Sequence, residues 1–174
     1  NIISLRDYIE RRKDLDGVNI KTFCLLMKKV SEKIEQDKRN LIKINIDDIQ
    51  IDITTGDIIL SDSLFGNGDM DKTISGFNTG ISLMADRKSS QEHKTVAFAL
   101  MILGWYYNED KSAITNDLAV LENFDLYMSK VPKWLHDYFI NIFKKMDYST
   151  SFNKYYEINF KQKIKDDIYA EFAS

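Results

Sequence analysis

The sequence is poor in the features that mark secreted, membrane-spanning and zinc-binding proteins. Cys24 is the only cysteine among 174 residues, so neither an internal disulfide nor a cysteine-rich zinc site can form. The first residues lack the basic segment and the apolar stretch of a signal peptide. The longest apolar run, 96–105, has about half the length that a membrane-spanning helix requires. We therefore predict a cytoplasmic protein without a membrane partner.

An excess of positive charge is also missing. The 24 lysine and arginine residues are interspersed with 27 aspartate and glutamate residues, which gives a net charge of −3. Because no broad basic face is available for phosphates, we expect no nucleic-acid partner. The hydrophobic share of 44% and the aromatic share of 12% suit a compact fold with a real core. Since no linker or repeat interrupts the chain, we predict a single domain over residues 1–174.

Helical periodicity dominates the pattern of apolar residues. The hydroxyl of Ser4 is placed to cap a short helix over 5–13. A long amphipathic helix is predicted over 19–38, because its apolar residues recur at steps of three and four. Segment 95–107 is apolar around its whole circumference, which is typical of a helix enclosed by protein. Further helices are predicted within 113–129, from Pro132 to Met146, and over 154–172.

The segment between these helical regions has the alternation of a β-structure. Isoleucines occupy every second position over 42–46 and again over 49–53, and Thr55-Gly56-Asp57 supplies a turn before the apolar residues 58–60. A small β-hairpin is therefore predicted. The stretch 63–82 is rich in glycine and polar residues without periodicity, which indicates an irregular loop. The predicted fold class is mainly α-helical with a small β-hairpin.

The order of these elements, together with three local segments, carries a resemblance to a known family. The segments are Ser4-Leu5-Arg6-Asp7-Tyr8-Ile9, the stretch from Asp48-Ile49-Gln50-Ile51-Asp52 through Thr55-Gly56-Asp57 to Ser61-Asp62, and Leu83-Met84-Ala85. In order and spacing the chain resembles the C-terminal lobe (C-lobe) of eukaryotic-like Ser/Thr protein kinases. The resemblance implies a kinase C-lobe fold whose N-terminal lobe (N-lobe), with its glycine-rich phosphate loop and ATP-anchoring lysine, is absent from this chain. It therefore implies no cofactor, with ATP and Mg²⁺ only when an N-lobe is present.

The resemblance also assigns catalytic positions, and several hold the wrong side chains. Kinases use a catalytic-loop Asp as proton acceptor, a Lys, and a metal-binding Asn and Asp. These positions fall on Lys43, Asn45, Asp48 and Asp62, respectively. An ammonium group cannot accept the substrate proton, and Asn45 lacks the positive charge. The family's orienting Asp on the buried helix corresponds to Lys94, a reversal of charge.

These departures favour a pseudokinase-like scaffold or regulatory module, which binds a protein partner or the missing N-lobe and has no catalytic residues. One alternative is an atypical phosphotransferase that uses Asp48 and Asp62 as metal ligands; another is a helical interaction domain unrelated to kinases. An Asp that closes a strand before a glycine-rich loop is also ordinary turn or cap chemistry, and this is the favoured explanation of Asp62. Three other candidates have structural explanations. His93 and His136 are expected at the surface or at helix ends, and Cys24 is expected as a buried hydrophobe.

Overall fold

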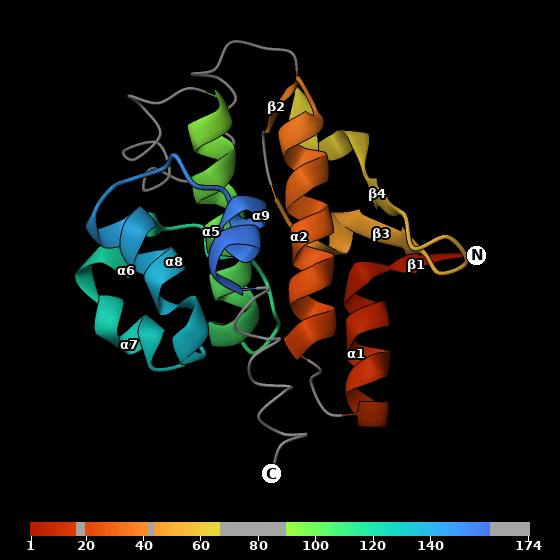
Figure 1. Ribbon diagram of the computed structural model, residues 1–174, viewed down its shortest axis with the longest axis horizontal. Coiled ribbons are helices and arrows are strands. Elements are labelled where there is room, and N and C mark those ends of the chain that lie inside the picture. Colours follow the sequence, from red (N-terminus) through yellow and green to blue (C-terminus); the bar gives the residue numbers. More distant parts are fainter. Residues whose placement is uncertain (17–19, 42–43, 67–89, 161–174) are drawn as a thin grey trace.

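A computed structural model describes residues 1–16, 20–41, 44–66 and 90–160 of the chain. These residues are mostly helical, with a small antiparallel sheet at one side (Figure 1). Within the described ranges, no helix combines the length and the apolar character needed to cross a bilayer. Several predictions lie outside these ranges: Lys43, most of the loop 63–82, the segment 83–87, and the end of the helix predicted over 154–172.

The two N-terminal helices follow the predicted pattern. Helix α1 spans Leu5–Asp16, and the Ser4 hydroxyl caps it by accepting a hydrogen bond of 3.1 Å from the Asp7 amide. Helix α2 spans Ile20–Gln36 and is amphipathic. The apolar residues that recur along α2 are all buried: Phe23, Met27, Val30 and Ile34. The predicted cap and the predicted amphipathic helix are therefore confirmed, with small differences at their ends.

The predicted hairpin is present and belongs to a three-stranded sheet. Strands β3 (Ile49–Asp52) and β4 (Ile58–Leu60) pair antiparallel, and the turn between them contains Gly56 at a φ of 78°. Strand β1 (Ile2–Ser4) pairs with the other side of β3, which gives the order β1-β3-β4. The periodicity of the sequence did not indicate β1, because three residues are too few to establish an alternation.

The alternating isoleucines before the hairpin do not extend the sheet as predicted. Strand β2 covers only Asn40–Leu41 and pairs with β5 (Phe65–Gly66), away from the three-stranded sheet. Residues Ile46–Asp48 form a 3-10 helix, η1. Ile44 and Ile46 are both buried, so the apolar positions serve the core without strand pairing.

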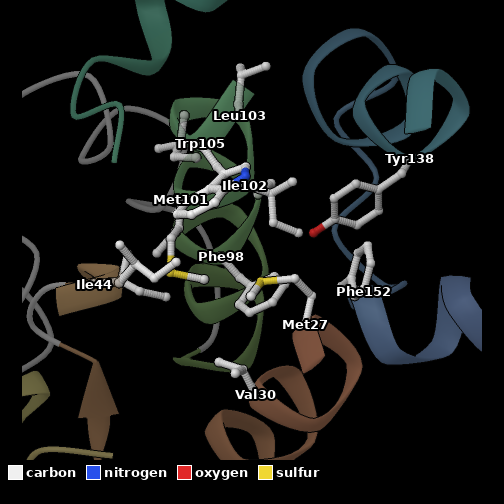
Figure 2. Packing of buried hydrophobic residues seen from close by; sticks show 14 of the residues in the cluster. Met27, Val30, Ile44, Phe98, Met101, Ile102, Leu103, Trp105, Tyr138 and Phe152 are labelled. Carbon is white, nitrogen blue, oxygen red and sulfur yellow. The ribbon is translucent and has the colours of Figure 1, made fainter. Parts of the chain in front are cut away.

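Helix α5 (Ser90–Tyr107) forms the centre of the molecule, as the sequence predicted. Every residue from Val96 to Leu103 is at most 3% exposed. Figure 2 shows side chains of α5 meeting α2 on one side and the C-terminal helices on the other. Phe23 of α2 stacks on Trp105 with ring centroids 5.8 Å apart, and Phe98 contacts Phe152 at 5.7 Å. A helix that packs on all sides has no polar face, which explains its sequence.

Short helices complete the described chain around α5. They are α6 (Asp117–Glu122), α7 (Phe124–Met128), η3 (Lys133–Leu135), α8 (His136–Phe139), η4 (Ile140–Lys144), α9 (Phe152–Tyr155) and η5 (Tyr156–Phe160). Pro132 directly precedes η3, consistent with the helical start predicted there. Tyr138 of α8 is 1% exposed and packs edge-on against Phe152. Helices α6, α7 and α8 lie on the side of α5 away from the hairpin, and α9 packs against both α2 and α5 (Figure 1).

Candidate functional site

Two short turns bring three of the four predicted site residues to one end of the hairpin. The 3-10 helix η1 precedes β3, and a second one, η2 (Asp62–Leu64), follows β4. The amide of Ser61 donates a hydrogen bond of 3.2 Å to the carbonyl oxygen of Asp48, which joins the two turns. We call residues 44–48 and 61–64 the hairpin base. It contains Asn45, Asp48 and Asp62, whereas Lys43 lies outside the described residues.

Asn45 has a structural role in the hairpin base. Its backbone is extended, and its side-chain oxygen accepts a hydrogen bond of 3.0 Å from the Asp47 amide. An asparagine at this position satisfies an amide at the start of η1 that would otherwise lack a partner. Asn45, at the position where the resemblance implies the catalytic lysine, thus caps η1.

Asp47 forms an ion pair with an arginine from the N-terminal helix. Nε and Nη2 of Arg6 lie 2.5 and 3.1 Å from the two carboxylate oxygens of Asp47. Nη1 of Arg6 also donates to the Asp110 carbonyl at 2.6 Å. Strand alternation would place Asp47 and Asp48 on opposite faces, but both lie in η1, where Asp47 is exposed and pairs with Arg6.

Asp62 is also held by an arginine. Nη1 of Arg39 lies 3.2 Å from a carboxylate oxygen of Asp62, whose side chain is 93% exposed. The same guanidinium donates hydrogen bonds from Nε and Nη2 to the carboxylate of Asp37, and it lies over the ring of Phe65. Its hydrogen bonds lower the pKa of the Asp37 carboxyl below the ordinary value. Arg39 therefore links the end of α2 to the hairpin base.

The metal-binding prediction for Asp48 and Asp62 can be compared with this geometry. Carboxylate oxygens suit hard divalent cations. However, the guanidinium of Arg39, which also pairs with Asp37, lies 3.2 Å from Asp62 and partly offsets the attraction of this carboxylate for a cation. In the part of the chain that the structure describes, no group of three or more His, Cys, Asp or Glu side chains could hold a metal ion. The assignment of Asp48 and Asp62 to a metal stays a prediction.

Two adjacent residues of α5 contact the segment that leads to the hairpin base. The ammonium of Lys94, 4% exposed, donates a hydrogen bond to the Asp37 carbonyl oxygen, and burial lowers its pKa. His93 was expected at the surface or at a helix end. It lies in the first turn of α5, near the start of the helix, but it is fully buried, so the prediction of a surface position is wrong. Burial lowers the pKa of His93 to about 4, against the opposing effect of a hydrogen bond with the Leu41 backbone.

The other two structural predictions hold. Nε2 of His136, in the first residue of α8, lies 2.9 Å from the Val131 carbonyl oxygen, so this histidine is at a helix end. Cys24 is fully buried, and burial raises the pKa of its thiol.

A groove runs along the outer edge of β4, between the hairpin and α2. One part of about 420 Å³ is lined by Lys33, Gln36, Asp37, Arg39 and residues 58–60. A second part of about 160 Å³ shares Lys33, Gln36 and Ile58 and continues to Lys29, Glu32, Gly56 and Asp57. Sequence reasoning did not indicate this groove. Its walls come from separate elements, and only the order of the strands determines which edge remains open.

Sequence reasoning also missed Arg6 and Arg39, because an arginine in a helix or loop carries no sign of a distant carboxylate. The described site thus combines a hairpin base, whose acidic side chains Asp47 and Asp62 pair with arginines, and a neighbouring groove along a strand edge. Comparisons of the chain with protein-family models, with curated proteins and with solved structures found no match.

Proposed function

We propose that this chain is a kinase-like C-lobe scaffold that acts by binding a protein and does not transfer phosphate. The observation that carries the proposal is the pairing of the acidic side chains at the hairpin base. Asp47 is bound by Arg6 through two hydrogen bonds, and the exposed Asp62 lies 3.2 Å from Arg39. A carboxylate that is to accept a proton needs to be available to substrate, and Asp47 is already engaged by Arg6.

The packing around α5 supports the kinase-like part of the proposal. A helix that is buried from His93 to Trp105, with α2 and the hairpin on one side and the C-terminal helices on the other, is what the resemblance leads us to expect. The pairing of β2 with β5 also brings the segment before the hairpin base next to the segment after it. This arrangement brings Asn45, Asp48 and Asp62 to one end of the hairpin, which is consistent with the resemblance.

The side chains themselves support the non-catalytic part. The sequence places Lys43 at the position of the proton acceptor, and Asn45 uses its side chain as a cap. The guanidinium of Arg39 lies beside Asp62 and weakens the attraction of this carboxylate for a divalent cation that carries ATP phosphates. We derive no chemical step through such a cation. The buried Lys94 holds the Asp37 carbonyl, so the charge-reversed position also has a structural contact.

Phosphotransferase activity is tested directly. The purified full-length gene product is incubated with radiolabelled ATP and Mg²⁺ or Mn²⁺, alone and with generic protein substrates. We expect no incorporation above a control without protein. Robust transfer that Asp62→Asn abolishes and the matched surface change Asp57→Asn leaves intact would overturn the proposal. A thermal-shift titration with ATP and Mg²⁺ should likewise show no stabilisation, because only a ligand of the native state raises the Tm.

A further inference from the structure

We propose that helices α6 and α7 form a latch controlled by a proton, which stays closed while the buried carboxyl group of Asp117 is protonated and opens more often once that group is ionised. The latch consists of residues 116–128 and lies on the side of α5 away from the hairpin (Figure 1). This inference goes beyond the proposed function, because it needs neither a kinase-like fold nor a protein partner. It rests on the burial of Asp117, on the surroundings of its oxygens, and on the shortness of both helices.

Asp117 is the first residue of α6, and its side chain is completely buried. Its exposed fraction is 0%, as is that of Val120, which lies one turn later on the same face. Leu118, between them, is 36% exposed, so the helix holds an acidic side chain inside and a large apolar one outside. Carboxylates are almost never fully buried without a partner. Asp117 therefore needs either a compensating contact in the interior or a proton.

The carboxylate oxygens of Asp117 have no such contact. Within the described residues, neither oxygen has a hydrogen-bond partner. The amides of Leu118 and Ala119, which begin the helix, donate instead to the side-chain oxygen of Asn116 at 3.1 and 3.3 Å. An ionised carboxyl group in such a place costs much more free energy than a protonated one. Burial accordingly raises the pKa of Asp117 to about 7, although the backbone amides of Asp117 and Leu118 oppose the rise.

Among the described residues, no charged side chain offsets this cost. Helices α7 and η4 pack against α6. The titratable side chains on these three helices are Glu122, Asp125, Tyr127 and Lys144. Neither they nor any other titratable side chain of the described ranges influences the pKa of Asp117, which burial raises and backbone amides lower. The ammonium of Lys144 lies over the ring of Phe124 instead, 4.9 Å from its centroid. The closed latch thus favours the protonated carboxyl group.

Both helices are short enough to open without the rest of the protein. Helix α6 has six residues and α7 has five, and helices of this length are stable only when they pack against other elements. The buried side chains of Val120, Phe124 and Met128 hold the latch, together with the ring of Tyr127, which lies 4.3 Å from that of Tyr107 at the end of α5. Such a segment opens locally at a lower free energy than the whole protein unfolds.

Opening brings Asp117 into water, where its pKa returns to the ordinary value of 3.8. The open latch therefore releases its proton at a lower pH than the closed latch. Protonation stabilises the closed state fully below about pH 4, and this effect is lost as the pH rises to about 7. Over this range opening becomes up to roughly tenfold more frequent per pH unit, and about a thousandfold more frequent in total.

Hydrogen exchange followed by NMR measures the opening of the latch at single amides. The reporters are the amides of Asn123 and Tyr127, which donate to the carbonyl oxygens of Ala119 and Asn123 at 3.1 and 3.2 Å. After correction for the pH dependence of intrinsic exchange, we expect their opening to increase nearly tenfold per unit between about pH 5 and 6.5 and to level off above about pH 7. The control is the amide of Leu64 in η2, which donates to the Ser61 carbonyl oxygen at 3.1 Å and should open equally at every pH.

Two substitutions show whether Asp117 is the group that titrates. Asp117→Asn keeps the shape of the side chain but cannot ionise, so the opening of the latch should become independent of pH. Asp125→Asn removes an exposed carboxyl group from the same latch and should leave the pH dependence intact. If Asp117→Asn does not fold, carbon NMR of the carboxyl groups in the unmodified protein decides. The Asp117 carboxyl should titrate near pH 7, whereas titration near the ordinary value of 3.8 contradicts the latch.

Three further results would overturn the proposal. Opening that stays constant from about pH 5 to 8, or that keeps its pH dependence in Asp117→Asn, excludes control by this carboxyl group. Exchange at Asn123 and Tyr127 that rises with urea as steeply as global unfolding would show that the two helices do not open by themselves. Local opening exposes little surface, so its exchange should depend only weakly on urea.

Discussion

Arg6 and Asp47, 41 residues apart in sequence, form a two-pronged ion pair that fastens the first turn of α1 to the hairpin base. The same guanidinium reaches the Asp110 carbonyl oxygen, in the segment that follows α5. One side chain thus connects three separate parts of the chain. Asp47 therefore has a structural role in the hairpin base, where the resemblance to kinases implies the catalytic residues.

Replacing Arg6 should therefore destabilise the fold. Arg6→Ala removes three hydrogen bonds, two of them to a carboxylate, and we expect the free energy of unfolding to fall by about 1–2 kcal/mol. Urea denaturation measures the change. Arg11→Ala removes an exposed arginine of the same helix and should change stability by less than about 0.5 kcal/mol. Equal effects of the two substitutions would show that the contact adds nothing to stability.

Gly104 on α5 should tolerate no side chain. A Cβ at this position would lie 2.1 Å from the Ser112 carbonyl oxygen and 2.9 Å from Cα of Ala113. Helix propensity alone predicts that Gly→Ala stabilises by about 1 kcal/mol. We expect the clash with backbone to dominate, so Gly104→Ala should lower stability by at least about 2 kcal/mol. Thermal unfolding tests this, and a Tm that rises in the variant would contradict the close approach.

Two buried ionisable groups should give opposite dependences of stability on pH. Burial raises the pKa of Asp117 to about 7, against the opposing effect of nearby backbone amides. Its contribution to stability is complete below pH 4 and is lost as the pH rises towards 7. Burial lowers the pKa of His93 to about 4, so its contribution is complete above pH 6.5 and is lost as the pH falls. Between these limits the two slopes oppose each other.

Single substitutions should reveal each slope. In Asp117→Asn, the free energy of unfolding should rise with pH between 4.5 and 6.5 more steeply than in the unmodified protein, by up to about 1.4 kcal/mol per pH unit. In His93→Gln it should change in the opposite direction over the same range. Urea titrations at several pH values measure both. Parallel curves for all three proteins would show that neither group shifts its pKa on folding.

Cys24 should be unreactive in the folded protein. Its side chain is fully buried, and burial raises the pKa of the thiol, so little thiolate is available. We expect Ellman's reagent to modify it slowly under native conditions and rapidly in concentrated urea. Rapid stoichiometric labelling without denaturant would show that the start of α2 opens readily.

Local patterns in the sequence predicted a large part of the fold. Three predicted features are confirmed: the Ser4 cap, the apolar face of α2 and the uniformly apolar α5. Each depends on residues that are close in sequence, so the spacing of polar and apolar residues is enough to predict it. The sequence predicted a strand at Ile46–Asp48, where the structure has a 3-10 helix, because Ile46 continues the alternation of the isoleucines before it. An Asn cap and a two-residue period make conflicting predictions there, and the cap decides the backbone.

The candidate site was predictable only in part. Spacing brought Asn45, Asp48 and Asp62 together, because a hairpin returns the chain to its starting point. The roles of their neighbours did not follow from spacing. Burial of His93 depends on Leu41 and the surrounding core, and an arginine gives no sign of the carboxylate it will meet.

The sequence by itself determined the long helices α1, α2 and α5, most of the apolar residues of the core and the turn of the hairpin, since these depend on local periodicity and on apolar surface. Only the tertiary structure decided that Arg6 meets Asp47, that Arg39 meets Asp62 and that β4 has an open edge beside Lys33. The physical reason is that charge pairs and strand edges form between segments distant in sequence. Their partners are chosen by the packing of whole elements, which no local pattern records.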